Sequence, residues 1–479
     1  MKEKNIYENR LRRMEAFKRL INLGLSFLSL ALEIAIFAYF WFYHFQNSIV
    51  ETLHFYKNGH VLEISIYGVV LFAFSKMYGG TRLGYLKNTE IIFSQIFATA
   101  IADIIIYGEL SLMAFELFLP RMFLWMFAAQ SLVLIIYTNL ANHMYRKIFP
   151  PRKLLLIHGM RSTADILAKF ASRKDKYIIT RSELVRPKME ENFRLIDEGY
   201  RNGEINAVVI WDISAGERDK ILKHCYAQSI RIYLMPKISD VILSNAEELH
   251  VFDSPMYLTR EYCLTMEQRF MKRMIDIVCS LILLVIASPI MLITAILIKI
   301  SDGGPVFYKQ VRCTLNQREF LILKFRSMRT DAEKNGQAVL AKKKDDRITP
   351  VGRVIRKCRI DELPQLINIL KGDMSFIGPR PERPEIIAQY LEVMPEFVYR
   401  MKVKAGLAGF AQVYGKYNTT PYDKLKLDLT YIENYSIWLD IKLMLLTLKV
   451  LFWPDSTEGV DAEQITALRE ENRKHGKQE

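Results

Sequence analysis

The decisive stretch for the fold class is IVCSLILLVIASPIMLITAILI, residues 277–298. It carries no charge and is long enough for the roughly 20 residues that an α-helix needs to cross a bilayer. Basic residues flank it on both sides: Arg269, Lys272 and Arg273 before it, and Lys299, Lys309, Arg312 and Arg318 after it. Because flanking Lys and Arg favour the cytoplasmic side of a membrane, both ends of the run are expected on that side.

The dipeptide Ser288-Pro289 lies in the middle of this run. Proline has no backbone N–H and clashes with the preceding turn, so it predicts that the helix breaks there. We therefore expect a re-entrant helix-break-helix segment that enters and leaves a single leaflet. The alternative is a kinked fifth span, which would put every later residue outside the cell.

Four further apolar runs open the chain. They are Ile21–Phe42, Val61–Met77, Ile91–Leu110 and Met122–Leu140. The first is too long for the core of a signal peptide and has no small-residue cleavage pattern, so we expect a retained anchor. Basic residues gather before the first run, between the second and third, and after the fourth. This alternation predicts a bundle of four spans with both ends in the cytoplasm.

Two acidic residues, Glu33 and Asp103, fall inside these runs. An ionisable residue within a membrane segment suggests a proton or ligand site. The alternative is hydrogen bonding between helices, or a position near the lipid headgroups. The sequence leaves both interpretations open.

The composition fits a chain that is partly in the membrane and partly in water. Its 479 residues predict two to four domains, and 51% hydrophobic with 25% charged residues excludes a disordered or collagen-like chain. Five scattered cysteines without a CxxC, and eight histidines without an HExxH, argue against a disulfide scaffold or a zinc site. The net charge of +14 points to an anionic partner: nucleic acid, a lipid surface or a phosphorylated substrate.

The segment after the fourth run alternates strands and helices. Strands are expected at Leu154–Ile157, Tyr177–Thr180, Ala207–Trp211 and Ile230–Leu234, with helices near Ala164–Arg173 and Glu217–Gln228 between them. This order is typical of a parallel sheet in a Rossmann-like α/β domain. The turn after the first strand has only Gly159, whereas a dinucleotide fingerprint needs three glycines. The ligand of this domain therefore stays open.

The stretch RVIRKCRIDELPQLINILKGD, residues 353–373, carries the strongest chemical signal. Pro364 suits the first turn of a helix and Gly372 its end, so Asp361 and Glu362 stand at a helix N-terminus, where the dipole favours ionised carboxylates and phosphate. Four cations precede the pair: Arg353, Arg356, Lys357 and Arg359. An ionised Asp361 there could attack phosphorus while Glu362 binds Mg²⁺. The alternative is that Asp361 caps the helix and Glu362 only complements its dipole.

Further cations lie on either side of this stretch. A strand is expected over Phe320–Phe325. Lys324 lies near its end and Arg326 directly after it, an arrangement of two close cations that suits a diphosphate. The loop Gly378-Pro379-Arg380-Pro381 is stiffened by its prolines and presents Arg380, which suits bidentate phosphate binding. The alternatives are a solvated charged strand and a rigid surface turn.

Together these motifs resemble the bacterial sugar transferase family, the monotopic polyprenyl-phosphate sugar-1-phosphate transferases of exopolysaccharide and O-antigen pathways. The motifs are KRMID (272–276), SP (288–289), GPVFY (304–308), KFRSM (324–328), DAE (331–333), DELPQL (361–366), KGDMS (371–375) and GPRP (378–381). They cover about Gln268–Trp453. One departure is Cys313-Thr314, where the family usually has a glycine. The N-terminal runs and the α/β segment resemble the long members of the family.

The resemblance implies that Asp361 attacks the β-phosphorus of a UDP-sugar and releases UMP. Polyprenyl (undecaprenyl) phosphate would then accept the sugar phosphate, and Glu362 would help to hold Mg²⁺. The residues implied in phosphate or substrate binding are Lys324, Arg326, Arg353, Arg359, Gln365 and Arg380. The implied partners are the UDP-sugar, polyprenyl phosphate and membrane lipid, with no nucleic acid and with a homo-oligomer left open.

The expected architecture has four parts. They are a four-helix transmembrane domain (1–150), a Rossmann-like α/β domain (151–265), a mostly α catalytic domain with the re-entrant helix (266–455) and a polar tail (456–479). The resemblance implies a multi-pass protein of the bacterial cytoplasmic (inner) membrane, with its catalytic domain on the cytoplasmic face. A membrane-bound NAD-dependent sugar-nucleotide modifying enzyme and a non-enzymatic assembly or regulatory protein are the alternatives. The sequence does not reveal which sugar is transferred.

Overall fold

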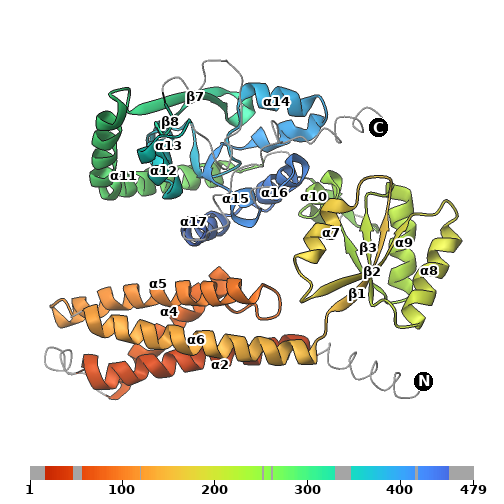
Figure 1. The fold of residues 1–479 in the computed structure, drawn as a ribbon, viewed down its shortest axis with the longest axis horizontal. Helices are drawn as coiled ribbons and strands as arrows, with labels where there is room; N and C mark the ends of the chain where they lie inside the picture. Colours follow the sequence, from red (N-terminus) through yellow and green to blue (C-terminus); the bar gives the residue numbers. More distant parts are fainter. Residues whose placement is uncertain are drawn as a thin grey trace. The chain divides into compact units, whose positions relative to one another are not determined.

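The computed structural model of the protein describes residues 17–46, 57–118, 120–250, 253–259, 263–329, 347–415 and 419–451. The chain forms two compact units, residues 1–235 and 236–479, which are described separately below (Figure 1). The polar tail predicted at 456–479 and the motif at 331–333 lie outside the described residues.

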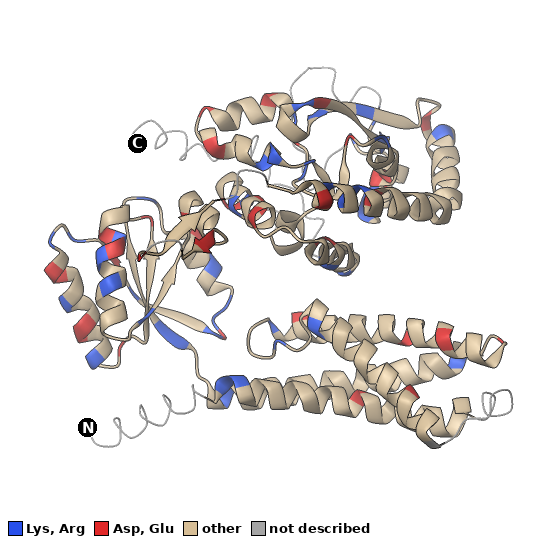
Figure 2. Cartoon of the chain, turned by 180° about the vertical axis from the view of Figure 1, so that it is seen from behind, with Lys and Arg blue, Asp and Glu red and all other residues tan. Residues whose placement is uncertain are grey.

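The first unit begins with long apolar helices. They are α2 (Lys18–Phe40), which continues as the π-helical turn η1 (Trp41–Phe45), α4 (Lys57–Tyr78), α5 (Asn88–Ala114) and α6 (Pro120–Ile148). Figure 2 shows few charged residues along them. Aromatic and aliphatic side chains such as Phe37, Tyr67 and Met126 fill the space between the helices, while Leu23 and Trp125 lie exposed on the outside. The four predicted runs are thus confirmed as helices long and apolar enough to cross a membrane.

A parallel sheet follows in the same unit. The elements are β1 (Arg152–His158), α7 (Ala164–Ala171), β2 (Tyr177–Leu184), α8 (Met189–Arg201), β3 (Ala207–Trp211), α9 (Ala215–Ala227) and β4 (Arg231–Leu234). The strand order is β2-β1-β3-β4, and all neighbours are parallel, as the sequence predicted. Side chains alternate between the two faces of β1: Leu155 and Ile157 pack with α8 and α9, whereas Leu154 and Leu156 pack with α7 (Figure 1).

The second unit starts with α10 (Ile238–Leu243), the short antiparallel pair β5 (Glu247–Leu249) and β6 (Met256–Leu258), and then the long helix α11 (Met266–Asp302). Thr265 caps the start of α11, since its side chain accepts a hydrogen bond from the Gln268 N–H at 3.3 Å. Gly303, with a left-handed φ of 69°, ends it. Helix α11 is the fifth described helix that is long and apolar enough to span a membrane.

The break predicted at Ser288-Pro289 is wrong, because α11 is helical through Pro289. Proline leaves the carbonyl of Val285 without its usual N–H donor. The hydroxyl of Ser288 donates to that carbonyl at 2.8 Å and so replaces the missing bond. The helix bends instead of breaking: Figure 1 shows the two halves of α11 running in different directions.

The remaining elements complete the second unit, and several of them pack against α11, including its second half around Ile298. They are β7 (Phe307–Cys313), η2 (Leu315–Gln317), β8 (Glu319–Phe325), α12 (Pro350–Lys357), η3 (Ile360–Glu362), α13 (Gln365–Lys371), β9 (Ser375–Ile377), α14 (Pro384–Leu391), η4 (Pro395–Lys402), β10 (Gly406–Ala408), α15 (Phe410–Tyr414), α16 (Pro421–Glu433) and α17 (Ile437–Leu451). Strands β7 and β8 form an antiparallel hairpin, and β9 and β10 a short parallel pair. A core that includes Ile322, Leu366, Phe376 and Leu443 joins β8, α13, β9 and α17.

Candidate active site

The acidic pair lies in a tight turn between two helices. Helix α12 ends at Lys357, and Arg359 adopts a left-handed φ of 55°, which turns the chain sharply. Asp361 and Glu362 follow in the single 3₁₀ turn η3, directly before α13. The prediction that the pair precedes a helix ending at Gly372 is confirmed, since Gly372 caps α13 with a φ of 90°.

Glu362 is held by two cations from other parts of the chain. Lys324 of β8 donates to Glu362 Oε1 at 3.1 Å, and Arg380, from the loop after β9, donates to the same oxygen at 2.9 Å. Burial opposes ionisation of Glu362, but the charges of Lys324 and Arg380 outweigh it and hold the pKa of Glu362 below its ordinary value. The Glu362 side chain is only 14% exposed, whereas that of Arg380 is 43% exposed, so the ion triplet is open to solvent on the Arg380 side.

Asp361 stands beside this triplet without a partner of its own. Within the described residues its carboxylate makes no hydrogen bond and no ion pair. Burial, followed by the negative charge of Glu362, raises the pKa of Asp361 to about 6, although Lys324, Arg356 and Arg380 act against the rise. At neutral pH Asp361 is therefore mostly ionised, poorly solvated and close to positive charge. A carboxylate in its ionised form can act as a nucleophile.

The loop that carries Arg380 is fixed from several sides. The Gly378 N–H donates to Ala408 O and the Gly406 N–H donates to Pro379 O, each at 2.9 Å, which ties the loop to β10. A Cβ on Gly378 would lie 2.3 Å from the carbonyl oxygen of Lys404, so glycine is needed at this close approach. The backbone therefore presents Arg380 to Glu362 from a rigid position.

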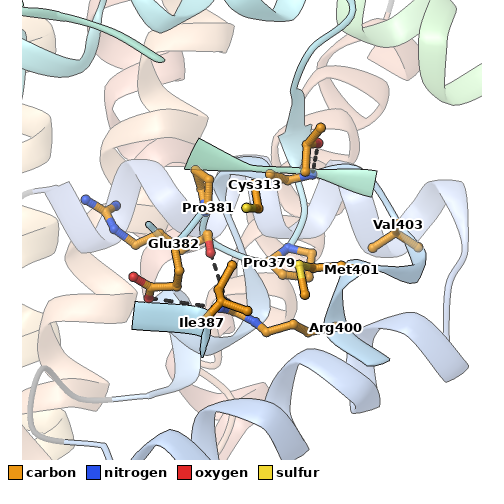
Figure 3. A pocket seen from close by; sticks show the side chains of 11 residues that line it. Cys313, Pro379, Pro381, Glu382, Ile387, Arg400, Met401 and Val403 are labelled. Carbon is orange, nitrogen blue, oxygen red and sulfur yellow. Dashed lines mark hydrogen bonds and ion pairs between the residues drawn. The ribbon is translucent and has the colours of Figure 1, made fainter. Parts of the chain in front are cut away.

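Two further arginines hold the same loop at the small pocket of Figure 3. Arg400 donates to the carbonyl of Arg380 at 3.0 Å, and Arg312 donates to the carbonyl of Pro381 at 3.1 Å. Pro379, Glu382 and Arg400 contribute to the lining of this pocket (Figure 3). Arg400 is itself buried and bonded to Asp428 at 2.8 Å. The loop itself lines part of this pocket, and the bonds from Arg400 and Arg312 help to position Arg380.

The structure brings together only some of the predicted binding residues. Lys324 and Arg380 contact Glu362, and the charge of Arg359 also acts on it. Gln365 is buried one helical turn beyond Asp361, and its side-chain nitrogen has no hydrogen-bond partner among the described residues. Two others are not gathered with them: Arg326 pairs with Asp302, and Arg353 is exposed on α12.

Sequence reasoning missed the residues that attach this site to α11. Lys272 is buried, and it donates to Asp440 of α17 at 2.5 Å, to Tyr431 of α16 at 3.1 Å and to the carbonyl of Ile377 at 2.9 Å. Ile377 lies three residues before Arg380. The signal was present in the KRMID motif, because Lys272 and Asp276 are four residues apart and therefore share a helix face.

Two neighbours of Lys272 on α11 also bind the segments around the site. Arg273 donates to the carbonyls of Ile369 and Leu370 at 2.6 Å each, at the C-terminal end of α13. Asp276 accepts from the Ser375 hydroxyl at 3.0 Å and from the Phe376 N–H at 2.9 Å. One helix thus holds both the segment that begins with the acidic pair and the strand that leads to Arg380.

These features define a class of protein: a membrane protein with a buried acidic pair and a cation clamp suited to a phosphorylated ligand. A sequence model described as bacterial sugar transferase matches residues 267–454. A glucose-1-phosphate transferase of Caulobacter vibrioides, named for UDP-glucose and undecaprenyl phosphate, is 37% identical over 190 residues, 39% of this chain and 71% of the relative. The chain belongs to the bacterial sugar transferase family, as the motifs predicted.

Two other relatives carry the names of different sugars. The UDP-N-acetylgalactosamine-undecaprenyl-phosphate N-acetylgalactosaminephosphotransferase of Aeromonas hydrophila is 39% identical over 251 residues, 50% of this chain and 56% of the relative. The undecaprenyl-phosphate galactose phosphotransferase of Salmonella typhimurium is 28% identical over 411 residues, 78% of this chain and 83% of the relative. The chain spans little more than half the length of the first curated relatives it matches.

Proposed function

We propose that this protein transfers a sugar 1-phosphate from a UDP-sugar to polyprenyl phosphate and releases UMP. The observation that carries the proposal is that Asp361, a carboxylate without a partner among the described residues, adjoins a carboxylate that two cations already neutralise. The names of the relatives support the same reaction, because they describe transferases that move a sugar phosphate to undecaprenyl phosphate.

The chemistry proceeds in two displacements. A carboxylate oxygen of Asp361 forms a bond to the β-phosphorus of the UDP-sugar, while the bond from that phosphorus to the bridging oxygen breaks and UMP leaves with the electron pair. A phosphate oxygen of polyprenyl phosphate then attacks the same phosphorus. The bond to Asp361 breaks, which regenerates the carboxylate and gives the polyprenyl-diphospho-sugar.

The cations stabilise the charge that moves in these steps. Lys324 and Arg380 lie within hydrogen-bond distance of Glu362, close enough to turn toward phosphate oxygens when these enter. The unpartnered amide nitrogen of Gln365 is a further donor for a substrate oxygen. Preorganised donors of this kind contribute most where charge develops in the transition state. Arg326 and Arg353 are not supported in this role, because one pairs with Asp302 and the other is exposed.

The donor set also fits Mg²⁺. Two hard carboxylates are adjacent, and neither Asp361 nor Glu362 Oε2 makes a hydrogen bond to any described residue. Magnesium is commonly held by one or two carboxylates together with substrate phosphates, so the pair does not need a third acidic ligand. Glu362 would hold the ion, which would supply charge neutralisation at the diphosphate. This chain's own part is to keep Glu362 ionised beside Lys324 and Arg380.

The membrane arrangement follows from the two substrates, of which one is soluble and the other embedded in lipid. We propose four spans from α2 to α6 in the bacterial inner membrane, a Rossmann-like domain and a catalytic unit in the cytoplasm. The bend of α11 and the basic residues at both of its ends support a re-entrant path. Asp361 would then lie at the depth of the headgroups.

The native cysteines test this topology, because Cys358 is the only exposed one of the five. In intact spheroplasts, a membrane-impermeant maleimide is expected to leave Cys358 unmodified, and permeabilisation should expose it. The Cys358→Ser variant identifies the modified site. Modification of Cys358 in intact spheroplasts would place the catalytic unit outside and make α11 a fifth span.

The nucleotide product distinguishes the candidate functions. Purified protein is supplied with Mg²⁺, polyprenyl phosphate and, in turn, UDP-glucose, UDP-galactose and UDP-N-acetylgalactosamine, the sugars suggested by the relatives' names. Release of UMP with at least one of them is the expected result. UDP as the product would indicate an ordinary glycosyltransferase, and the absence of both would favour an assembly or regulatory role.

A further inference from the structure

A layer of polar side chains crosses the interior of the N-terminal helix bundle. It receives Glu33 from α2, Tyr67 from α4, Thr99 and Asp103 from α5, and Gln130 from α6. Glu33 is 1% exposed and Asp103 is 5% exposed, and the other three are fully buried. Every helix of the bundle contributes to this layer, which the proposed transferase reaction does not use.

Within the described residues, each of the two carboxyl groups accepts its side-chain hydrogen bond from a neutral donor. The amide nitrogen of Gln130 donates to the Tyr67 hydroxyl at 2.6 Å and reaches the backbone carbonyl of Glu33 at 3.5 Å. Tyr67 donates in turn to Asp103 Oδ1 at 3.1 Å, and Thr99 donates to Glu33 Oε2 at 2.5 Å. Over the described part of the chain, no Lys, Arg or His forms an ion pair with either carboxylate.

The unsatisfied atoms of this layer are all acceptors. Among the described residues, Asp103 Oδ2 and Gln130 Oε1 are both buried without a hydrogen-bond partner, whereas the amide and hydroxyl donors of Gln130, Tyr67 and Thr99 are in use. The Gln130 amide lies between the Tyr67 hydroxyl and the Glu33 backbone, so its free oxygen belongs to the same cluster. What the cluster lacks is therefore a donor or a cation.

The charges around the layer also favour the binding of a cation. Each ion moved out of water into a protein interior costs several kcal/mol unless a charge of opposite sign compensates it. The ionisable groups that face the layer are Glu33, Tyr67 and Asp103, and α6 contributes only the neutral Gln130. Glu63 of α4 and Glu109 of α5 stand farther along their helices and add no positive charge. The layer thus combines excess negative charge with unused oxygen acceptors.

We infer that this layer is a binding site for one small monovalent cation, a proton or Na⁺, within the membrane bundle. Oxygen atoms from Glu33, Asp103, Gln130, Tyr67 and Thr99 form the donor set, which suits a hard cation. None of these residues belongs to the proposed transferase site, and the cation site is tested by a separate measurement. A negative result would therefore leave the proposed transferase reaction unaffected.

Carbodiimide labelling tests the site in the wild-type protein. Dicyclohexylcarbodiimide reacts with protonated carboxyl groups in apolar surroundings, and peptide mass spectrometry locates the adduct. We expect labelling at Glu33 or Asp103 that increases as the pH falls. Protection by NaCl, but not by choline chloride at equal ionic strength, would identify Na⁺ as a ligand. Pure pH dependence without protection by Na⁺ would identify the proton, and both results support the site.

Glu33→Gln and Asp103→Asn provide the matching variants, since each keeps the shape and removes the charge. Both should lose the label at the changed position and weaken the dependence of the unfolding temperature on pH or Na⁺. Glu116→Gln, at an exposed position between α5 and α6, is the control and should change neither. If wild-type Glu33 and Asp103 both stay unlabelled and neither variant alters those dependences, the network is only structural and the inference is overturned.

Discussion

Asp361→Asn is expected to lower the rate of UMP release by ~10³-fold or more, while the protein still folds and inserts. Asparagine has the same size but cannot attack phosphorus as a carboxylate does. Because Asp361 makes no hydrogen bond or ion pair with the described residues, its replacement breaks no contact. Turnover is measured with the UDP-sugar that the product screen selects, and folding by the unfolding temperature.

Asp253→Asn is the matched control, because Asp253 is exposed in the same unit and this variant should retain full turnover. With UDP-sugar but no acceptor, the wild type should carry a sugar phosphate on the peptide containing Asp361, and the Asn variant should carry none. Full turnover by Asp361→Asn would remove this residue from the role of nucleophile.

The pH profile checks the same prediction independently. Burial and Glu362 raise the pKa of Asp361 to about 6, so the fraction of ionised nucleophile falls as the pH drops below that value. The rate of UMP release should decline on this acid limb. In Glu362→Gln, the loss of the neighbouring negative charge lowers the pKa of Asp361. The acid limb of any residual activity should then move to lower pH.

Lys272→Met is expected to destabilise the second unit strongly. Lys272 and Asp440 form a buried ion pair with side chains 11% and 5% exposed, and removal of one partner of such a pair costs about 3–5 kcal/mol. The carbonyl of Ile377 loses a donor at the same time, which loosens the strand that leads to Arg380. The unfolding temperature and the rate of UMP release should therefore fall together.

Lys309→Met serves as the control, because Lys309 is exposed on β7. In the double variant Lys272→Met with Asp440→Leu, the unpaired Asp440 carboxylate is gone, so part of the stability should return, although buried Asp276 still lacks the charge of Lys272. The rate should recover less, since Ile377 still lacks the Lys272 donor. A Lys272→Met protein with the unfolding temperature of the wild type would show that the pair contributes no net stability.

Local pattern was enough to predict the apolar helices, the parallel strands and the start of the helix that follows Asp361 and Glu362. Hydrophobic runs and alternation report which residues are buried, and Pro364 and Gly372 mark helix ends through their backbone geometry. The predictions failed where a side chain changes a local rule. The hydroxyl of Ser288 supplies the bond that Pro289 removes, so α11 bends where a break was expected.

Contacts between residues far apart in the sequence could not be predicted either. Lys324 and Arg326 look equivalent in the sequence, yet one reaches Glu362 and the other Asp302. Lys272 finds its counter-ion 168 residues away, at Asp440. Periodicity gives the face on which a side chain lies, but the residue opposite that face is set by tertiary packing, which no local spacing encodes.

The contacts of Lys272, Arg273 and Asp276 have a practical consequence for any shortened version of this protein. A fragment starting after Asp302 would leave Asp440 without a cation and would remove donors from Ile369, Leu370 and Ile377. Helix α11 is therefore a structural part of the second unit as well as an apolar segment that could enter the membrane. The smallest autonomous piece begins no later than Thr265, where α11 is capped.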